Sequence, residues 1–202
     1  AAFVEFASAQ YRALHGLWTF FLCMDRWLAE LPEDAYDLIL FDCPPAIGYQ
    51  SLNAAFAADV LYIPTGPGYW EYDSTTSFLG QLGDALGEIA EGFRRQAGPD
   101  AVKTFEAVRI LMTRYEAGNA LHQSMFDAYR GLFGAELCHA PIELSRAVEQ
   151  SGRFQMSVYE QDYREMTRET WRRSRESFDA AWAEARDVIL EAWRARETLA
   201  EA

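Results

Sequence analysis

Asp42 is the residue whose position most clearly suggests chemistry, because it ends a short apolar run from Leu38 to Phe41. The Cys43-Pro44-Pro45 sequence that follows interrupts regular structure, and such a bounded apolar run is typical of a strand buried on both faces of a parallel sheet. An acidic residue at the carboxyl end of that strand points into the crevice where open α/β sheets bind ligands. A carboxylate there can help to hold Mg²⁺. The pattern is short, and an ordinary turn capped by Asp42 explains it equally well.

The rest of the chain predicts the elements that would position Asp42. Apolar runs predict strands at residues 38–41, 60–64, 107–112 and 136–139, and helical patterns cover residues 3–30, 51–58, 74–93, 119–133 and 161–200. Strands that alternate with helices predict repeated βαβ crossovers, hence an α/β fold with a mostly parallel sheet flanked by helices. The length of 202 residues suits a single domain over residues 1–202.

Composition excludes several classes of protein. The net charge of −13 disfavours a whole-surface attraction to nucleic acid or anionic membranes, although a local basic patch remains possible. No apolar run approaches the roughly 18 residues that span a bilayer, and the first residues lack the basic segment of a signal peptide. The three cysteines (Cys23, Cys43 and Cys138) are widely spaced, and the three histidines show no ligand spacing. A disulfide scaffold or zinc site is therefore not expected, and a reducing cytoplasm fits.

Several segments resemble one family in the same order along the chain. The segments YDLILFDCPPAIGY and LNAAFAADVLYIPTGP resemble the ParA/MinD-type partition ATPases. The segment ILMTRYEAGNALHQSMFDAYRGLFG and the residues after Ala140 are similar to the later half of ParA proteins from plasmid replication-partition operons, and FVEFASAQYRAL resembles the segment before the Asp-Cys-Pro-Pro strand. The resemblance covers nearly the whole chain. It implies a P-loop NTPase fold of the deviant Walker type, here without its first strand and P-loop.

The resemblance also implies roles for individual residues, with ATP and Mg²⁺ as the cofactors of the intact family. Asp42 would be the catalytic acidic residue near Mg²⁺, which it would hold through water. Residues 43–48 would form the switch loop that senses the γ-phosphate, and two later loops would flank the base. The implied nucleotide-binding positions are Cys43, Pro44 and Pro45 in the switch loop, Thr113, Arg114 and Tyr115 in the first base-side loop, and Pro141 and Ile142 in the second.

An arginine cluster is the main basic feature, since Lys103 is the only lysine. Four of its members recur at spacings of three and four, so they share one helical face. The family binds DNA nonspecifically in this region in its ATP-bound dimer, and the resemblance therefore implies contacts to DNA phosphates. The interleaved acids Glu165, Glu169 and Glu176 leave open a solvated, charge-balanced face. The six implied DNA-binding residues are Arg153, Arg164, Arg168, Arg172, Arg173 and Arg175.

The GxxxxGK[ST] loop that cradles phosphate is missing from the sequence. Lys103 lies in GPDAVKT, where Val102 replaces the second glycine, Pro99 removes one N–H group and a strand follows rather than a helix. We therefore expect a fragment of a longer protein, or a degenerate relative, that does not hydrolyse ATP alone. The initial alanine favours the fragment. Because the missing strand would leave sheet edges unpaired, we also expect a homodimer.

The leading functional hypothesis is a ParA-type protein for ATP-dependent DNA segregation. It would act in the bacterial cytoplasm, associated with the nucleoid or a plasmid, together with a centromere-binding partition protein. The alternative is a non-enzymatic interaction module derived from the ParA fold. A relative of the nitrogenase iron protein is disfavoured, because cysteines are lacking at the expected cluster positions.

Two aromatic features favour packing over binding. An apolar stripe at helical spacing predicts a core-packing helix face, and nearby acidic residues argue against a membrane-binding tail. The segment Tyr69-Trp70-Glu71-Tyr72 follows a Gly-Pro-Gly loop; packing of its aromatic side chains at a helix start is favoured over a partner surface. The stripe consists of Phe178, Trp182, Ala185, Ile189 and Trp193.

Overall fold

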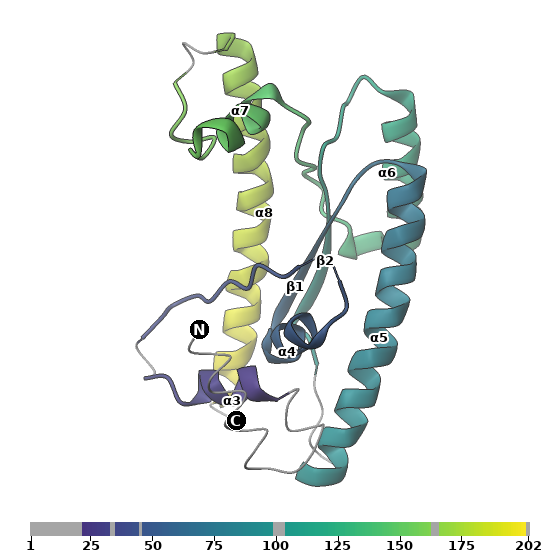
Figure 1. Ribbon diagram of the computed structural model, residues 1–202, viewed down its shortest axis with the longest axis vertical. Coiled ribbons are helices and arrows are strands. Elements are labelled where there is room, and N and C mark those ends of the chain that lie inside the picture. Colours follow the sequence, from purple (N-terminus) through teal and green to yellow (C-terminus); the bar gives the residue numbers. More distant parts are fainter. Residues whose placement is uncertain (1–21, 33–34, 45, 99–103, 163–165, 201–202) are drawn as a thin grey trace. The chain divides into compact units, whose positions relative to one another are not determined.

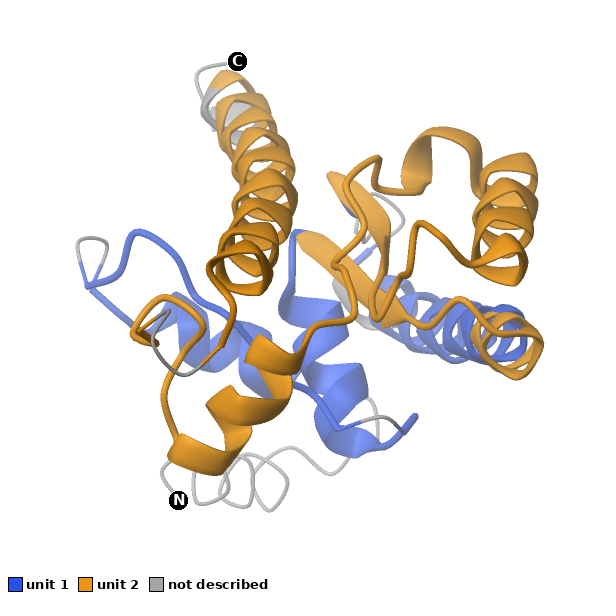
Figure 2. Cartoon of the chain, turned by 90° about the horizontal axis from the view of Figure 1, so that it is seen from above, with its two compact units in different colours: residues 1–59, 76–105 blue, residues 60–75, 106–202 orange. Residues whose placement is uncertain are grey.

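The computed structural model, shown in Figure 1, describes residues 22–32, 35–44, 46–98, 104–162 and 166–200. The chain divides into two compact units, which are coloured separately in Figure 2. One unit comprises residues 1–59 and 76–105, and the other comprises residues 60–75 and 106–202.

The second unit contains a parallel sheet of two strands, β1 (Val60–Thr65) and β2 (Ala107–Met112). Their register runs from Val60 opposite Ala107 to Thr65 opposite Met112. Parallel neighbours require a crossover connection, and helix α5 (Tyr69–Ala97) lies between the two strands in the sequence. The strands predicted at 60–64 and 107–112 and the α/β class are therefore confirmed. Helix α5 extends beyond the predicted residues 74–93 at both ends.

Helices α6 (Ala120–Phe133) and α8 (Arg168–Ala200) lie on opposite sides of the two strands (Figures 1 and 2). Helix α6 begins where the sequence predicts, because the side chain of Asn119 accepts hydrogen bonds from the first backbone N–H groups of the helix. It ends at Gly134, whose positive φ of 54° suits glycine. The core between β2 and α6 is formed by Ile110, Met112, Met125, Phe126 and Tyr129.

The strand predicted at residues 136–139 is not formed. The 3₁₀ helix η1 (Gly134–Glu136) occupies its start, and Leu137 makes only an isolated bridge to Ile110. Cys138 N donates a hydrogen bond to Ile110 O at 2.9 Å. The chain turns immediately after α6, so too few residues run beside β2 to build a strand.

The strand predicted at residues 38–41 is also absent. These residues have no regular secondary structure, and Leu38, Ile39 and Leu40 are 44%, 38% and 77% exposed. A strand needs a neighbour to pair its backbone groups, and the sheet in the described part of the chain contains β1 and β2 alone. The apolar run alone could not supply that partner.

The first unit contains helices α3 (Cys23–Ala29) and α4 (Tyr49–Ala57). Helix α4 confirms the helix predicted at 51–58. Helix α3 falls within the predicted helix 3–30, of which residues 3–21 lie outside the described residues. Phe56 is 3% exposed and packs edge-on against Phe93 of α5 at 5.7 Å between ring centroids.

The helical region predicted at 161–200 begins later than expected, at Arg168. Thr167 accepts a hydrogen bond from Thr170 N at 3.2 Å, as an N-cap residue does. A separate helix, α7 (Arg146–Phe154), precedes it and was not predicted. Its N-cap is Ser145, whose hydroxyl accepts from Ala147 N at 3.1 Å.

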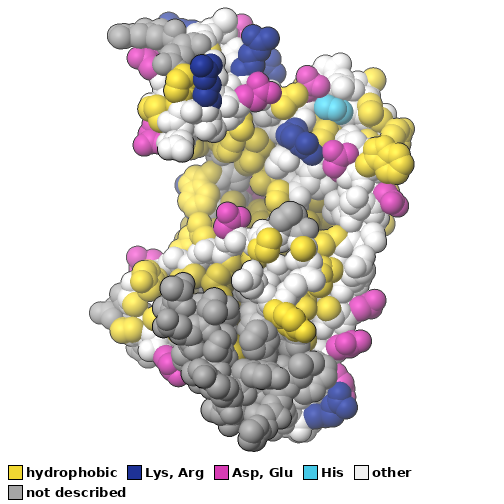
Figure 3. Space-filling view, viewed as in Figure 1, with side chains coloured by type: hydrophobic (Ala, Val, Ile, Leu, Met, Phe, Trp, Pro, Cys, Tyr) yellow, Lys and Arg dark blue, Asp and Glu magenta, His cyan; other side chains and the backbone are white. Residues whose placement is uncertain are grey.

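The prediction that the aromatic stripe of α8 packs into the core is wrong for its two tryptophans, while Phe178, Ala185 and Ile189 are half-buried. Trp182 and Trp193 are 53% and 45% exposed, whereas Ser174 and Val188 are 3% and 8% exposed. Figure 3 shows hydrophobic side chains on the surface around α7 and the middle of α8. The face of α8 that packs against its own unit is therefore built largely from small and polar side chains. None of the described helices is both long and apolar enough to cross a bilayer.

Candidate functional site

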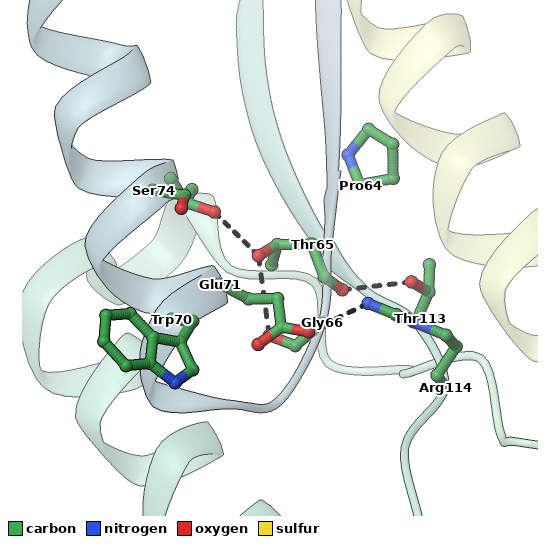
Figure 4. A pocket seen from close by; sticks show the side chains of 9 residues that line it. Pro64, Thr65, Gly66, Trp70, Glu71, Ser74, Thr113 and Arg114 are labelled. Carbon is green, nitrogen blue, oxygen red and sulfur yellow. Dashed lines mark hydrogen bonds and ion pairs between the residues drawn. The ribbon is translucent and has the colours of Figure 1, made fainter. Parts of the chain in front are cut away.

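A pocket of about 410 Å³ opens at the carboxyl ends of β1 and β2 (Figure 4). Ligands of open α/β sheets bind at this end of parallel strands, where loops and helix starts converge. The pocket belongs entirely to the second unit. Its lining comes from the end of β1, the first turns of α5 and the loop after β2: Pro64, Thr65, Gly66, Trp70, Glu71, Ser74, Thr75, Thr113 and Arg114.

Three buried hydroxyl groups lie together at this pocket. Thr65 Oγ1 lies 2.7 Å from Thr75 Oγ1 and 2.9 Å from Tyr129 OH, so a hydrogen-bonded cluster joins β1, α5 and α6. Thr113 donates to Thr65 O through both its backbone N at 2.7 Å and its hydroxyl at 3.0 Å. Because buried polar groups are costly unless paired, this cluster fixes the positions of the pocket-lining residues. Sequence patterns gave no sign of it.

An ion pair crosses the mouth of the pocket. Arg114 Nη2 lies 3.1 Å from Glu71 Oε1, with 61% and 38% of the respective side chains exposed. Arg114 has a positive φ of 58°, an uncommon conformation for a residue with a side chain. A Cβ atom at Gly66 would run into the side chains of Arg114 and Glu71, and one at Gly68 would run into Glu71. The glycines of the β1–α5 loop therefore leave room for this pair.

Trp70 lies beside the ion pair on the first turn of α5 (Figure 4). Trp70 and its neighbour Tyr69 are 84% and 65% exposed. The prediction that the aromatic side chains of residues 69–72 pack at the helix start is therefore wrong for these two residues. Tyr72, one turn later, does pack there, edge-on to Tyr129 at 5.0 Å between ring centroids.

The two predicted base-side loops lie side by side. In the η1–α7 loop (residues 137–145), Ile142 O accepts a hydrogen bond from Tyr115 N at 3.0 Å, and Ile142 N donates to Met112 O at 2.8 Å. Leu144 N donates to Tyr115 O at 2.9 Å. These bonds connect the η1–α7 loop to the β2–α6 loop (residues 113–119). The structure thus brings together the predicted residues Thr113, Arg114 and Tyr115 with Pro141 and Ile142.

Helix α8 holds the η1–α7 loop from its other side. Ser177 Oγ accepts from Glu143 N at 2.8 Å and donates to Pro141 O at 3.3 Å. Arg173 pairs with the Glu143 carboxylate at 2.8 Å, and the hydroxyls of Ser145 and Ser174 are hydrogen-bonded. The polar face of α8 therefore fixes the η1–α7 loop.

Glu184 of α8 also contacts the η1–α7 loop. Its carboxylate accepts from His139 N at 2.9 Å and from Ala140 N at 3.0 Å. Burial alone would raise the pKa of Glu184, but the hydrogen bonds from these two backbone groups and from the His139 ring leave that pKa below its usual value. The ionised carboxylate therefore belongs to the folded structure. Sequence reasoning missed this residue, since a helical glutamate gives no local sign of a distant partner.

The Cys138 thiol and the Tyr62 hydroxyl lie close enough to Glu184 to be affected by its charge. Burial, followed by the charge of Glu184, raises the pKa of the Cys138 thiol to about 11. Burial and then the neighbouring Cys138 raise the pKa of Tyr62 to about 12. Both groups are neutral near neutral pH, so neither offers a nucleophile.

Asp42 and Cys43 belong to the first unit, and both are exposed in a segment without regular structure. Desolvation and then the Asp42 carboxylate raise the pKa of the Cys43 thiol, which disfavours a reactive thiolate. The described residues contain no group of three or more His, Cys, Asp or Glu side chains that could hold a metal. Mg²⁺ is commonly held by one or two carboxylates together with substrate phosphates, so the role of Asp42 at Mg²⁺ stays a prediction. Pro44 is exposed, and Pro45 lies outside the described residues.

The predicted DNA-binding arginines differ in how firmly they are held. Arg175 lies over the rings of Trp171 and Tyr159, at 4.8 Å and 5.2 Å, and Arg153 lies over Phe154 at 5.5 Å. Arginine side chains gather around α7 and the start of α8, with acidic side chains among them (Figure 3).

Ion pairs engage two further members of the cluster. Arg172 pairs with Glu176 of the same helix at 3.7 Å, whereas Arg173 pairs with Glu143. Arg168 begins α8, and Arg164 lies outside the described residues. Both alternatives therefore stay open for this cluster: a face that binds DNA phosphates, and a solvated face whose charge is partly balanced by acidic residues.

Comparison with known proteins places this arrangement in a family. A family model described as an AAA domain matches residues 9–90. The chain is 33% identical over 175 residues to the "Putative replication protein A" of Sinorhizobium fredii (strain NBRC 101917 / NGR234). This match covers 87% of this chain and 41% of that protein. It is 35% identical over 97 residues to Protein SopA of Escherichia coli K12, which covers 48% of this chain and 22% of that protein.

A third relative is the chromosome-partitioning ATPase Soj of Treponema pallidum, 36% identical over 78 residues, which covers 39% of this chain and 27% of that protein. The chain thus spans less than half the length of each of these three relatives. The matches agree with the α/β fold. This chain belongs to the ParA/MinD-type family of partition ATPases.

Proposed function

We propose that this chain is the C-terminal portion of a ParA-type protein for ATP-dependent DNA segregation, and that it forms one ParA-like α/β domain over residues 1–202. The observation that carries the proposal is the hydrogen bonding between the β2–α6 loop, at Tyr115, and the η1–α7 loop, at Ile142. The two loops lie beside the pocket at the carboxyl ends of β1 and β2. A pocket of this size suits part of a nucleotide. Family membership supports ATP and Mg²⁺ as the ligands of the intact protein.

Under this proposal the residues divide between base and phosphate ends of the nucleotide. Thr113, Arg114, Tyr115, Pro141 and Ile142 contact or support the base. Residues 43–45 belong to the switch loop, and Asp42 acts on Mg²⁺ through water. The phosphate-cradling loop GxxxxGK[ST] is absent from these residues, so we propose that the chain alone does not hydrolyse ATP.

The same proposal assigns partners. The arginines of α7 and α8 contact DNA phosphates without reading sequence, and a centromere-binding protein and a second copy of the chain complete the assembly in the bacterial cytoplasm. Six residues form the proposed DNA interface: Arg153, Arg164, Arg168, Arg172, Arg173 and Arg175.

The first test is the binding of a fluorescent ATP analogue with Mg²⁺, measured by anisotropy on the wild-type chain and on Asp42→Ala. We expect no tight binding by either, because backbone N–H groups and a lysine that hold phosphate are missing. Tight binding that Asp42→Ala abolishes would show that the chain is competent without a P-loop, contrary to the proposal. Titration with duplex DNA at two salt concentrations tests the second half: salt-sensitive binding supports partition, and its absence supports a non-enzymatic interaction module.

A further inference from the structure

Glu143 lies at the centre of the η1–α7 loop and is held from two sides. On the sheet side, the flanking residues Ile142 and Leu144 are hydrogen-bonded to Tyr115, and Glu143 forms a parallel bridge with Tyr115. On the helix side, Glu143 N donates to Ser177 Oγ and its carboxylate pairs with Arg173. Glu143 therefore contacts both the β2–α6 loop and α8.

Arg173 differs from its neighbour Arg172 in the partner it uses. Arg172 pairs with Glu176 within α8 at 3.7 Å, whereas Arg173 reaches out of the helix to Glu143 at 2.8 Å. The two arginine side chains are similarly exposed, at 61% and 55%. A phosphate that binds Arg172 leaves the η1–α7 loop unchanged. A phosphate that binds Arg173 removes the ion pair between this loop and α8.

We infer that a DNA phosphate and the Glu143 carboxylate compete for Arg173. DNA bound on α8 would then loosen the η1–α7 loop and change the β2–α6 loop at Tyr115. The inference rests on the proposed DNA binding by α8. Exposed ion pairs contribute little stability, while Arg binds phosphate through two parallel hydrogen bonds. The exchange of partners is therefore easy in either direction. The two states differ in whether Arg173 is paired with Glu143 or with phosphate.

This competition makes a prediction about affinity. Glu143→Gln removes the competing charge while keeping a side chain of similar shape, so the chain should bind DNA about two- to fivefold more tightly. The matched control is Glu176→Gln, which frees Arg172 instead. Glu176→Gln should raise DNA affinity to a similar degree without changing the exchange of the loop amides.

The decisive measurement is amide hydrogen exchange at Tyr115 and Leu144, by NMR, with and without a short mixed-sequence DNA duplex at low salt. The wild-type chain, Arg173→Gln and Arg172→Gln are compared. In the wild type we expect DNA to speed exchange at both amides. Arg173→Gln should exchange fast without DNA and respond no further, whereas Arg172→Gln should behave like the wild type. Each substitution should lower the salt dependence of DNA binding by about one phosphate contact.

The outcomes separate this inference from the proposed function. If DNA binds but leaves exchange at Tyr115 and Leu144 unchanged in the wild type, the coupling is wrong and DNA binding stands. If Arg172→Gln and Arg173→Gln give the same exchange pattern, Arg173 has no special role, and the inference is also overturned. If no variant binds DNA at low salt, the affinity measurement itself rejects the proposed DNA interface, and the inference falls with it.

Discussion

The hydroxyl oxygens of Thr65 and Tyr129 lie 2.9 Å apart, although 64 residues separate them in the chain. Together with Thr75 they join the end of β1, the start of α5 and the middle of α6 at the candidate pocket. Tyr129 is 0% exposed, so its hydroxyl exchanges water for these two partners. The position of the pocket residues therefore depends on contacts between segments that are remote in the sequence.

Tyr129→Phe should lower the free energy of unfolding by about 0.5 to 1.5 kcal/mol, because it removes one buried hydroxyl and leaves the two threonines to pair with each other. Urea unfolding of the wild type and the variant measures the difference. Tyr69→Phe is the control, since Tyr69 is 65% exposed and its change should be close to zero. Equal effects of the two substitutions would contradict a structural role for the hydroxyl cluster.

Glu184→Ala should destabilise the chain by about 1 to 2 kcal/mol near neutral pH, because it removes the acceptor for His139 N and Ala140 N. The pKa of Glu184 is lower in the folded protein than its usual value of 4.5. Its ionised form therefore contributes stability above the unfolded pKa, and this contribution is lost as the pH falls through the folded pKa.

Stability measured against pH for the wild type and for Glu184→Gln tests this linkage. The wild type should lose stability more steeply on acidification below the usual glutamate pKa, and the difference between the two proteins should shrink there. Parallel curves for the two proteins would show that Glu184 makes no such contribution.

Arg175→Ala and Arg168→Ala should separate packing from DNA binding. Arg175 lies over two aromatic rings, so its loss should cost about 0.5 to 2 kcal/mol of stability. Arg168, in the first turn of α8, should leave stability within about 0.5 kcal/mol of the wild type while weakening DNA binding. Thermal unfolding and DNA titration of both variants provide the comparison; a loss of stability in Arg168→Ala that matches Arg175→Ala would be the contrary result.

One thiol of three should react with a thiol reagent in the folded chain. Cys43 is exposed, whereas Cys23 and Cys138 are buried. Because the pKa of Cys43 is raised, its labelling rate should keep rising with pH beyond the range of an ordinary thiol. Cys43→Ser should abolish the fast reaction, and fast labelling of that variant would show that a buried cysteine is accessible.

Local sequence patterns were sufficient for the elements that carry their own signals. The runs of β1 and β2 are mostly apolar and each contains a valine and an isoleucine, and Asn119 provides the N-cap of α6. The family could also be predicted, because its segments occur in the right order. The strands predicted at 38–41 and 136–139 failed for one reason: a strand forms only with a neighbour beside it, and a single apolar run does not contain that information.

Tertiary structure alone decided how the site is assembled. The sequence by itself determined the α/β class, the family, the absence of a P-loop motif and the two loops that carry Thr113, Arg114, Tyr115, Pro141 and Ile142. It could not determine that these loops hydrogen-bond to each other, or that Glu143 pairs with Arg173. Nor could it determine that α8 presents Ser177 and Glu184 to the η1–α7 loop while Trp182 faces solvent. Helical periodicity identifies which residues share a face but not which face is covered, because burial depends on the elements that pack against the helix.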